Sequence, residues 1–165
     1  MIPNYKDGSI VNLMSSILQA FGQPSRYSQL RLLSPNELKS AENVILILVD
    51  GLGFSSIKGT GSFLEKFTRG KITTVFPSTT AACVTTFFTG VAPQQHALVG
   101  WHTYMKELGE IVVPLRYATR YGYPILANPK DIFKTPSVFE KIKARTFMIH
   151  PQEIANSPFN HAFRG

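Results

Sequence analysis

The residues best suited to chemistry in this sequence are an aspartate and a cluster of hydroxyl side chains. Asp50 directly follows the uncharged run Val44–Val49, and the hydroxyl cluster is Ser78, Thr79 and Thr80. Carboxylate oxygens bind Mg²⁺, Mn²⁺ and Zn²⁺. A hydroxyl at the start of a helix lies where phosphate oxygens bind, and a metal ion or a base can activate it to attack phosphorus. Each feature alone also has a structural interpretation, because Asp-Gly is an ordinary turn pair and Ser or Thr often caps a helix.

Two predicted strands would position these residues. The segment Asn43–Val49 has no alternation of polar and apolar residues, which is typical of a strand buried on both faces of a parallel sheet. Ile72–Phe76 is a second predicted strand, and Pro77 ends it. Ligands of open α/β sheets bind at the carboxyl ends of the strands. We therefore expect the Asp50 carboxylate and the hydroxyl cluster to converge there.

Periodicity, caps and turn residues indicate the remaining elements. The alternation of strands with helices predicts an α/β fold with a parallel sheet in one domain, with a helical lead-in at 1–42, an α/β core at 43–150 and a loop-like tail at 151–165. The other predicted elements are a helix over Ser9–Phe21, a short helix around Ser62–Phe67, a helix over Thr79–Phe88 closed by Gly90, a hairpin over Tyr104–Leu115 that turns at Leu108-Gly109, a helix from the Thr135-Pro136 cap to near Lys143, and a strand over Arg145–Ile149.

Composition limits the class of protein. The 165 residues are 44% hydrophobic and 16% charged, which predicts a packed core rather than disorder. The longest aliphatic run is far shorter than the roughly 20 residues of a membrane span, and no signal peptide is visible. The single cysteine, Cys83, excludes an internal disulfide. We therefore expect a cytoplasmic protein that does not bind membranes. The net charge of +7 includes no dense basic run, so we attribute it to the solvated surface rather than to nucleic-acid binding.

Four motifs occur in a fixed order along the chain. They are Val49-Asp50-Gly51-Leu52-Gly53, Phe76-Pro77-Ser78-Thr79-Thr80, Thr89-Gly90, and the segment Pro93–Gly100. Their order and spacing resemble the type I phosphodiesterase/nucleotide pyrophosphatase family of the alkaline phosphatase superfamily. The resemblance covers about Asn43–Trp101. It implies an alkaline-phosphatase-like three-layer α/β sandwich with a mostly parallel sheet, of which this chain carries the N-terminal part and which is incomplete at its C-terminus.

The resemblance also implies roles for individual residues. Asp50 matches a metal-binding aspartate, and Thr80 matches the threonine nucleophile, which also contacts metal. Thr79 is the alternative if the register differs by one residue. Members of the family usually hold two zinc ions, with Mn²⁺ or Mg²⁺ as alternatives, and hydrolyse phosphodiesters, nucleotide pyrophosphates or phosphomonoesters through a covalent intermediate. Cys83 replaces an asparagine that contacts a phosphate oxygen in nucleotide-cleaving members, and a thiol is a poor donor. This replacement argues against nucleotide specificity.

The histidines and aspartates do not complete a paired zinc site. Each catalytic zinc takes about three protein ligands, and the chain has four histidines and no Asp-His pair. We expect His96 to fix the geometry of its loop, and His102 either to line the mouth of the site or to be an ordinary surface histidine. The alternative function is therefore a catalytically incomplete fragment or pseudoenzyme that binds a phosphorylated ligand or a partner chain. An open sheet edge would also favour self-association.

Overall fold

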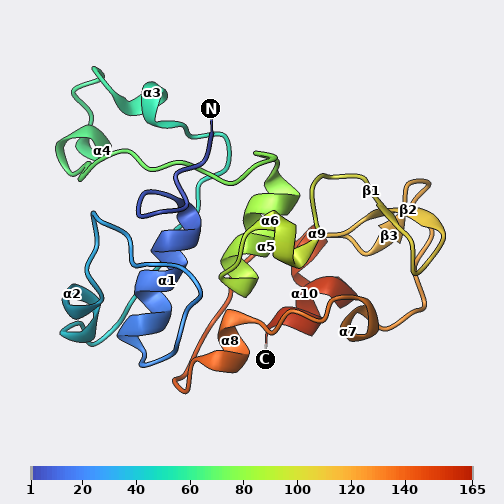
Figure 1. The fold of residues 1–165 in the computed structure, drawn as a ribbon. Helices are drawn as coiled ribbons and strands as arrows, with labels where there is room; N and C mark the ends of the chain where they lie inside the picture. The colour runs from blue at the N-terminus through green and yellow to red at the C-terminus, as the bar shows by residue number, and fades with distance from the viewer. Residues whose placement is uncertain (1, 165) are drawn as a thin grey trace.

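Helices make up most of the regular structure of the chain (Figure 1). The computed structural model describes residues 2–164. The helices are α1 (Ile10–Ala20), α2 (Pro35–Lys39), α3 (Phe54–Ile57), α4 (Phe63–Lys66), α5 (Thr80–Thr89), α6 (Pro93–His96), α7 (Pro129–Ile132), α8 (Val138–Lys141), α9 (Gln152–Ala155) and α10 (Pro158–Phe163). Three short strands, β1 (Thr103–Met105), β2 (Glu110–Val113) and β3 (Ala118–Thr119), form an antiparallel sheet in the order β1-β2-β3. No described helix is both long enough and apolar enough to cross a membrane.

Helix α1 confirms the prediction of a helix over Ser9–Phe21. The backbone N–H and the hydroxyl of Ser9 both donate to the side-chain oxygen of Asn12, at 3.0 and 2.6 Å, which fixes the first turn. The amide nitrogen of the fully buried Asn12 donates in turn to the carbonyl oxygens of Tyr5, Lys6 and Ser28. The start of α1 therefore holds the lead-in segment against the helix.

Helix α5 lies beside α1 and supports the candidate site at its N-terminus (Figure 1). Its threonines are tolerated because the buried hydroxyls of Thr85 and Thr89 donate to carbonyl oxygens one turn earlier, each at 2.7 Å. Gly90 ends the helix in the left-handed conformation with φ of +72°, as its sequence position predicts. Thr79 caps the other end, so both ends of α5 are defined and the helix supports the residues of its first turn.

The main core lies between α5, the small sheet and the C-terminal helices. Phe159 is completely buried and packs edge-on against Phe133, with ring centroids 5.0 Å apart. Its ring centroid also lies 4.8 Å from that of Phe163, with the two rings tilted. The prediction of a loop-like tail at 151–165 is therefore wrong for the part that the structure describes. Ser157 caps α10, and Pro158 occupies its first turn, so this segment carries an ordinary helix-start signal.

The antiparallel sheet confirms the predicted hairpin over Tyr104–Leu115, in which Thr103 pairs with Val112 and Met105 with Glu110. Two other predicted helices are present: α4 is capped by Ser62, and α8 is capped by Ser137 rather than by Thr135. The molecule thus combines α and β structure as predicted. Its three-stranded sheet is antiparallel, and a mostly parallel sheet does not occur among the described residues.

The predicted strands over Asn43–Val49, Ile72–Phe76 and Arg145–Ile149 do not form ladders. The second makes a single parallel bridge, between Ser9 and Thr73. The first and third are extended segments without a strand beside them in the described part of the chain. Burial on both faces needs flanking strands and covering layers, and residues 45–49 are instead exposed. Apolar composition indicates a tendency to form a strand, but only a pairing partner produces one.

Candidate active site

The structure brings the Asp50 carboxylate and the Thr80 hydroxyl together, although they are 30 positions apart. Thr80 Oγ1 lies 3.5 Å from Asp50 Oδ2, and both side chains are exposed to solvent. The other carboxylate oxygen, Oδ1, accepts the backbone N–H of Gly51 at 3.0 Å. Gly51 has φ of +74°, a conformation that favours glycine, so the Asp-Gly turn orients the carboxylate.

Thr79 and Thr80 have different environments. Thr79 is the N-cap of α5: its hydroxyl accepts the N–H of Ala82 at 3.4 Å and donates to the carbonyl oxygen of Val99 at 3.3 Å. Thr80 is the first residue of the helix, and its backbone N–H makes no hydrogen bond with another described residue. The Thr79 hydroxyl is therefore used within the fold, whereas Thr80 presents its hydroxyl to solvent beside Asp50, at the helix end where the dipole favours an anion.

Cys83 lies one turn further along α5 and is half-buried. Its Sγ is 2.9 Å from the hydroxyl oxygen of Thr74, which belongs to the extended segment before the hydroxyl cluster. The thiol packs with the apolar cluster that includes Val75 and Ala82. This contact holds the segment before Phe76 against α5. The thiol therefore has a structural role that needs no ligand.

His96 confirms the expectation that it fixes the geometry of its loop. Its ring is buried; Nδ1 accepts the backbone N–H of Leu98 at 3.1 Å, and Nε2 lies 3.1 Å from the hydroxyl of Thr86 on α5. Because Nδ1 accepts, the ring proton is on Nε2 and is donated to Thr86. Burial lowers the pKa of His96 to about 4, so the imidazole is neutral near pH 7.

The loop that His96 holds leads directly to the candidate site. It includes Val99, whose carbonyl oxygen accepts the Thr79 hydroxyl. His102 follows in the same loop; it is exposed, and its side chain makes no hydrogen bond with another described residue. His96 connects the loop to α5 through its hydrogen bonds with Leu98 and Thr86. The sequence near His96 carries no signal that predicts the contact with Thr86.

The oxygen atoms of Asp50 and Thr80 could provide part of the ligand shell of one cation, but they are too few for a paired zinc site. Asp50 and Thr80 supply a carboxylate and a hydroxyl oxygen within reach of each other, which are donors that hard and borderline cations accept. A catalytic zinc takes about three protein ligands, and the described residues contain no group of three histidine, cysteine, aspartate or glutamate side chains that could hold a metal ion.

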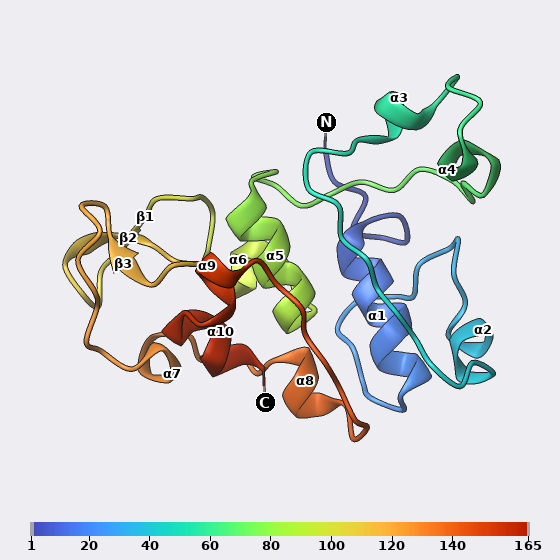
Figure 2. The same ribbon diagram turned by 180° about the vertical axis from the view of Figure 1, so that it is seen from behind.

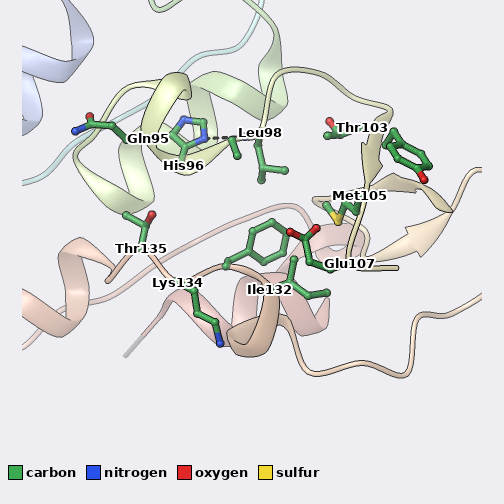
Figure 3. Close-up of a pocket in the computed structure, with 12 residues that line it drawn as sticks. Gln95, His96, Leu98, Thr103, Met105, Glu107, Ile132, Lys134 and Thr135 are labelled. Carbon is green, nitrogen blue, oxygen red and sulfur yellow. Dashed lines mark hydrogen bonds between the residues drawn. The ribbon is translucent and has the colours of Figure 1, made fainter. Parts of the chain in front are cut away.

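A cavity of about 220 Å³ lies elsewhere, between the α6 loop, β1 and the segment that follows α7 (Figure 3). Its lining includes His96, Met105, Glu107 and Lys134 but neither Asp50 nor Thr80. The cavity is therefore separate from the candidate site, which is an exposed helix terminus. His96 lines this cavity, and its ring accepts the backbone N–H of Leu98 (Figure 3).

Comparison with known proteins identifies the family. The sequence model of the type I phosphodiesterase/nucleotide pyrophosphatase family matches residues 44–147, which is more than half of the chain and includes the Asp-Gly turn, the hydroxyl cluster and the His96 loop. No curated protein and no solved structure gave a significant match. The matched range contains all four sequence motifs. The chain belongs to the type I phosphodiesterase/nucleotide pyrophosphatase family.

Proposed function

We propose that this protein hydrolyses phosphoesters with Thr80 as the nucleophile, and that Asp50 positions the hydroxyl and contributes to a divalent-metal site. The observation that carries the proposal is the 3.5 Å approach of the Thr80 hydroxyl to the Asp50 carboxylate at the N-terminus of α5. The family match supports phosphodiester or pyrophosphate hydrolysis as the class of reaction. The substrate class is a small phosphorylated molecule such as a nucleotide or another phosphodiester.

The chemistry follows from the direction of the hydroxyl proton. When Thr80 donates to Asp50 Oδ2, the oxygen lone pairs are free to face phosphorus on the solvent side. Attack forms the Thr80 Oγ–P bond and breaks the P–O bond to the leaving alcohol. Asp50 accepts the hydroxyl proton, and water protonates the leaving oxygen. The hydroxide left by that protonation then attacks phosphorus, the Oγ–P bond breaks, and Asp50 returns its proton to Oγ, which regenerates both the Thr80 hydroxyl and the Asp50 carboxylate.

The residues around Thr80 assist by charge and by position. The unpaired N–H of Thr80 and the positive end of the ten-residue helix α5 stabilise the negative charge on the phosphoryl oxygens. A single divalent cation, Zn²⁺, Mn²⁺ or Mg²⁺, would be held by the Asp50 carboxylate and the Thr80 hydroxyl oxygen; when bound, it would lower the pKa of the hydroxyl and neutralise charge in the transition state. We further propose that residues 44–49 and 145–149 are strands of the mostly parallel sheet in an alkaline-phosphatase-like three-layer fold.

Hydrolysis of chromogenic phosphate mono- and diesters, with added Zn²⁺, Mn²⁺ or Mg²⁺, tests the proposal. We expect Thr80→Ala and Asp50→Asn to abolish turnover, and Ser78→Ala, which removes the neighbouring exposed hydroxyl, to retain it. Acid quenching during turnover followed by peptide mass spectrometry should find the phosphoryl group on Thr80. Wild-type rates in Thr80→Ala, or a phosphoryl group on Thr79, would contradict the assignment.

A second candidate function is binding of a phosphorylated ligand without turnover. It is favoured because no group of three His, Cys, Asp or Glu side chains that could hold a metal ion occurs within residues 2–164. In this case inorganic phosphate or vanadate should bind in calorimetry, Thr80→Ala should weaken the binding, and no metal should produce hydrolysis. Binding together with measurable hydrolysis would exclude this candidate.

A further inference from the structure

Trp101 is the single tryptophan of the chain, and it lies in the loop between α6 and β1. It is 39% exposed, and its indole N–H makes no hydrogen bond with another described residue. A tryptophan that is packed inside a protein usually finds an acceptor for this N–H. The indole therefore presents an unused donor and part of an aromatic surface to a ligand.

The antiparallel hairpin brings Arg116 to this indole. Trp101 precedes β1, and Arg116 follows β2. The register places the start of β1 beside the end of β2, so the two residues lie at the same end of the hairpin. The Cζ atom of Arg116 lies 5.8 Å from the centre of the indole ring, which is a cation–π contact. The guanidinium also contacts the carboxylate of Glu153 on α9 at 3.3 Å, so the hairpin and α9 together hold the cation against the ring.

The loop that carries Trp101 is anchored to the first turn of α5. The carbonyl oxygen of Val99, two residues before Trp101, accepts the Thr79 hydroxyl at 3.3 Å. Two residues span at most about 7 Å, so the backbone of Trp101 lies within about 10 Å of that hydroxyl. Figure 2 shows the loop rising from α6 to the end of α5 at which this helix begins, as Figure 1 does from the other side. An organic group carried by a phosphoryl group at Thr80 is therefore within reach of the indole.

We propose that Trp101 and Arg116 form a subsite for an aromatic group on the organic part of the phosphoester, with the ligand ring stacked on the indole. The inference rests on the proposed function, because it extends the site at Thr80 by the group that holds the rest of its substrate. Stacked rings attract each other beyond the area that they bury, and an aliphatic group of the same size lacks this attraction. Arg116 holds the indole in place and adds a positive charge beside an anionic ligand.

Calorimetric titration with phenylphosphonate and cyclohexylphosphonate, with Zn²⁺ or Mg²⁺ present, tests the proposal. The two ligands have the same anionic group and nearly the same size, and their C–P bond is not an ester, so binding is measured without turnover. We expect phenylphosphonate to bind the wild type about fivefold more tightly. Trp101→Phe should keep most of this preference and Trp101→Leu should remove it. Equal affinities in the wild type, or an unchanged preference in Trp101→Leu, would overturn the proposal.

Two arginine variants and the fluorescence of Trp101 locate the bound ring. Arg116→Gln should weaken the binding of phenylphosphonate about threefold, because it removes the cation beside the indole. Arg120→Gln is the matched control: Arg120 makes a similar contact with Tyr121, 5.3 Å from the ring centre, and this variant should bind like the wild type. Saturating phenylphosphonate should alter the emission spectrum of the single tryptophan, and an unaltered spectrum at saturation would overturn the proposal. Circular dichroism checks that each variant is folded.

Competition and turnover separate failure of the subsite from failure of the proposed function. Inorganic phosphate should displace phenylphosphonate, because both place an anion at the start of α5; absence of competition would put the ring elsewhere and overturn the subsite. Phosphoester hydrolysis that depends on Thr80, without any preference for phenylphosphonate, would overturn the subsite alone. A Trp101-dependent preference without hydrolysis would support the subsite and contradict the proposed function. Binding of neither phosphonate would overturn the subsite.

Discussion

Acid should destabilise the fold through His96. The imidazole is buried between Thr86 on α5 and the backbone N–H of Leu98, and burial lowers its pKa from 6.5 to about 4. Protonation would place a proton on Nδ1, which now accepts a hydrogen bond. The unfolded chain has no such constraint and takes up the proton at the ordinary pKa. Stability is therefore complete above pH 6.5 and is lost as the pH falls toward 4.

The two pKa values determine the size of the effect. A difference between 6.5 and about 4 corresponds to a maximum loss of about 3.4 kcal/mol, reached below the folded pKa. Between about pH 7.5 and about pH 5 the extra proton bound by the unfolded state rises from about a tenth to about nine tenths and averages a little over half, so the loss is about 2 kcal/mol. This loss is a large fraction of the stability of a small domain.

Urea unfolding at a series of pH values, followed by circular dichroism, measures the effect. Lowered carboxyl pKa values at Glu37, Glu65 and Glu140 also make stability pH-dependent, so the informative quantity is the difference in unfolding free energy between the wild type and His96→Gln. We expect this difference to shrink by about 2 kcal/mol between about pH 7.5 and about pH 5. The control is His102→Gln, which alters an exposed side chain with no hydrogen bond to another described residue. A pH-independent difference for His96→Gln would refute the reasoning.

Two further predictions concern stability. Gly90→Ala should cost about 1–2 kcal/mol in urea unfolding, because φ is +72° there and the new Cβ would lie 3.0 Å from Leu18 Cδ1; an unchanged midpoint would show that α5 ends differently. Phe159→Ala should cost about 3–5 kcal/mol, measured by thermal or urea unfolding, because a completely buried ring between Phe133 and Phe163 is removed. A cost below about 1 kcal/mol would mean that α10 is not part of the core.

Local sequence signals predicted the features that a few neighbouring residues determine. The cap at Ser9, the left-handed end at Gly90 and the hairpin turn at Leu108-Gly109 are all where the sequence placed them. The missed helix α10 carried the same kind of signal, Ser157-Pro158 with aromatic residues four positions apart at Phe159 and Phe163. The apolar run at 44–49 and the segment 145–149 could not be resolved in this way, because strand pairing depends on residues distant in the sequence.

The candidate site shows why one part of it was predictable and another was not. Thr80 is fixed by α5, and the Thr79 cap joins that helix to the loop held by His96. Asp50 has no comparable anchor: its carboxylate is oriented by the Gly51 turn, and the segment that precedes it makes no backbone hydrogen bond within the described residues. The hydroxyl is thus positioned by a buried framework and the carboxylate by an unpaired strand. The Asp50–Thr80 contact is therefore held by a packed helix on the hydroxyl side and by a single local turn on the carboxylate side, and its precision depends on what supports residues 43–49.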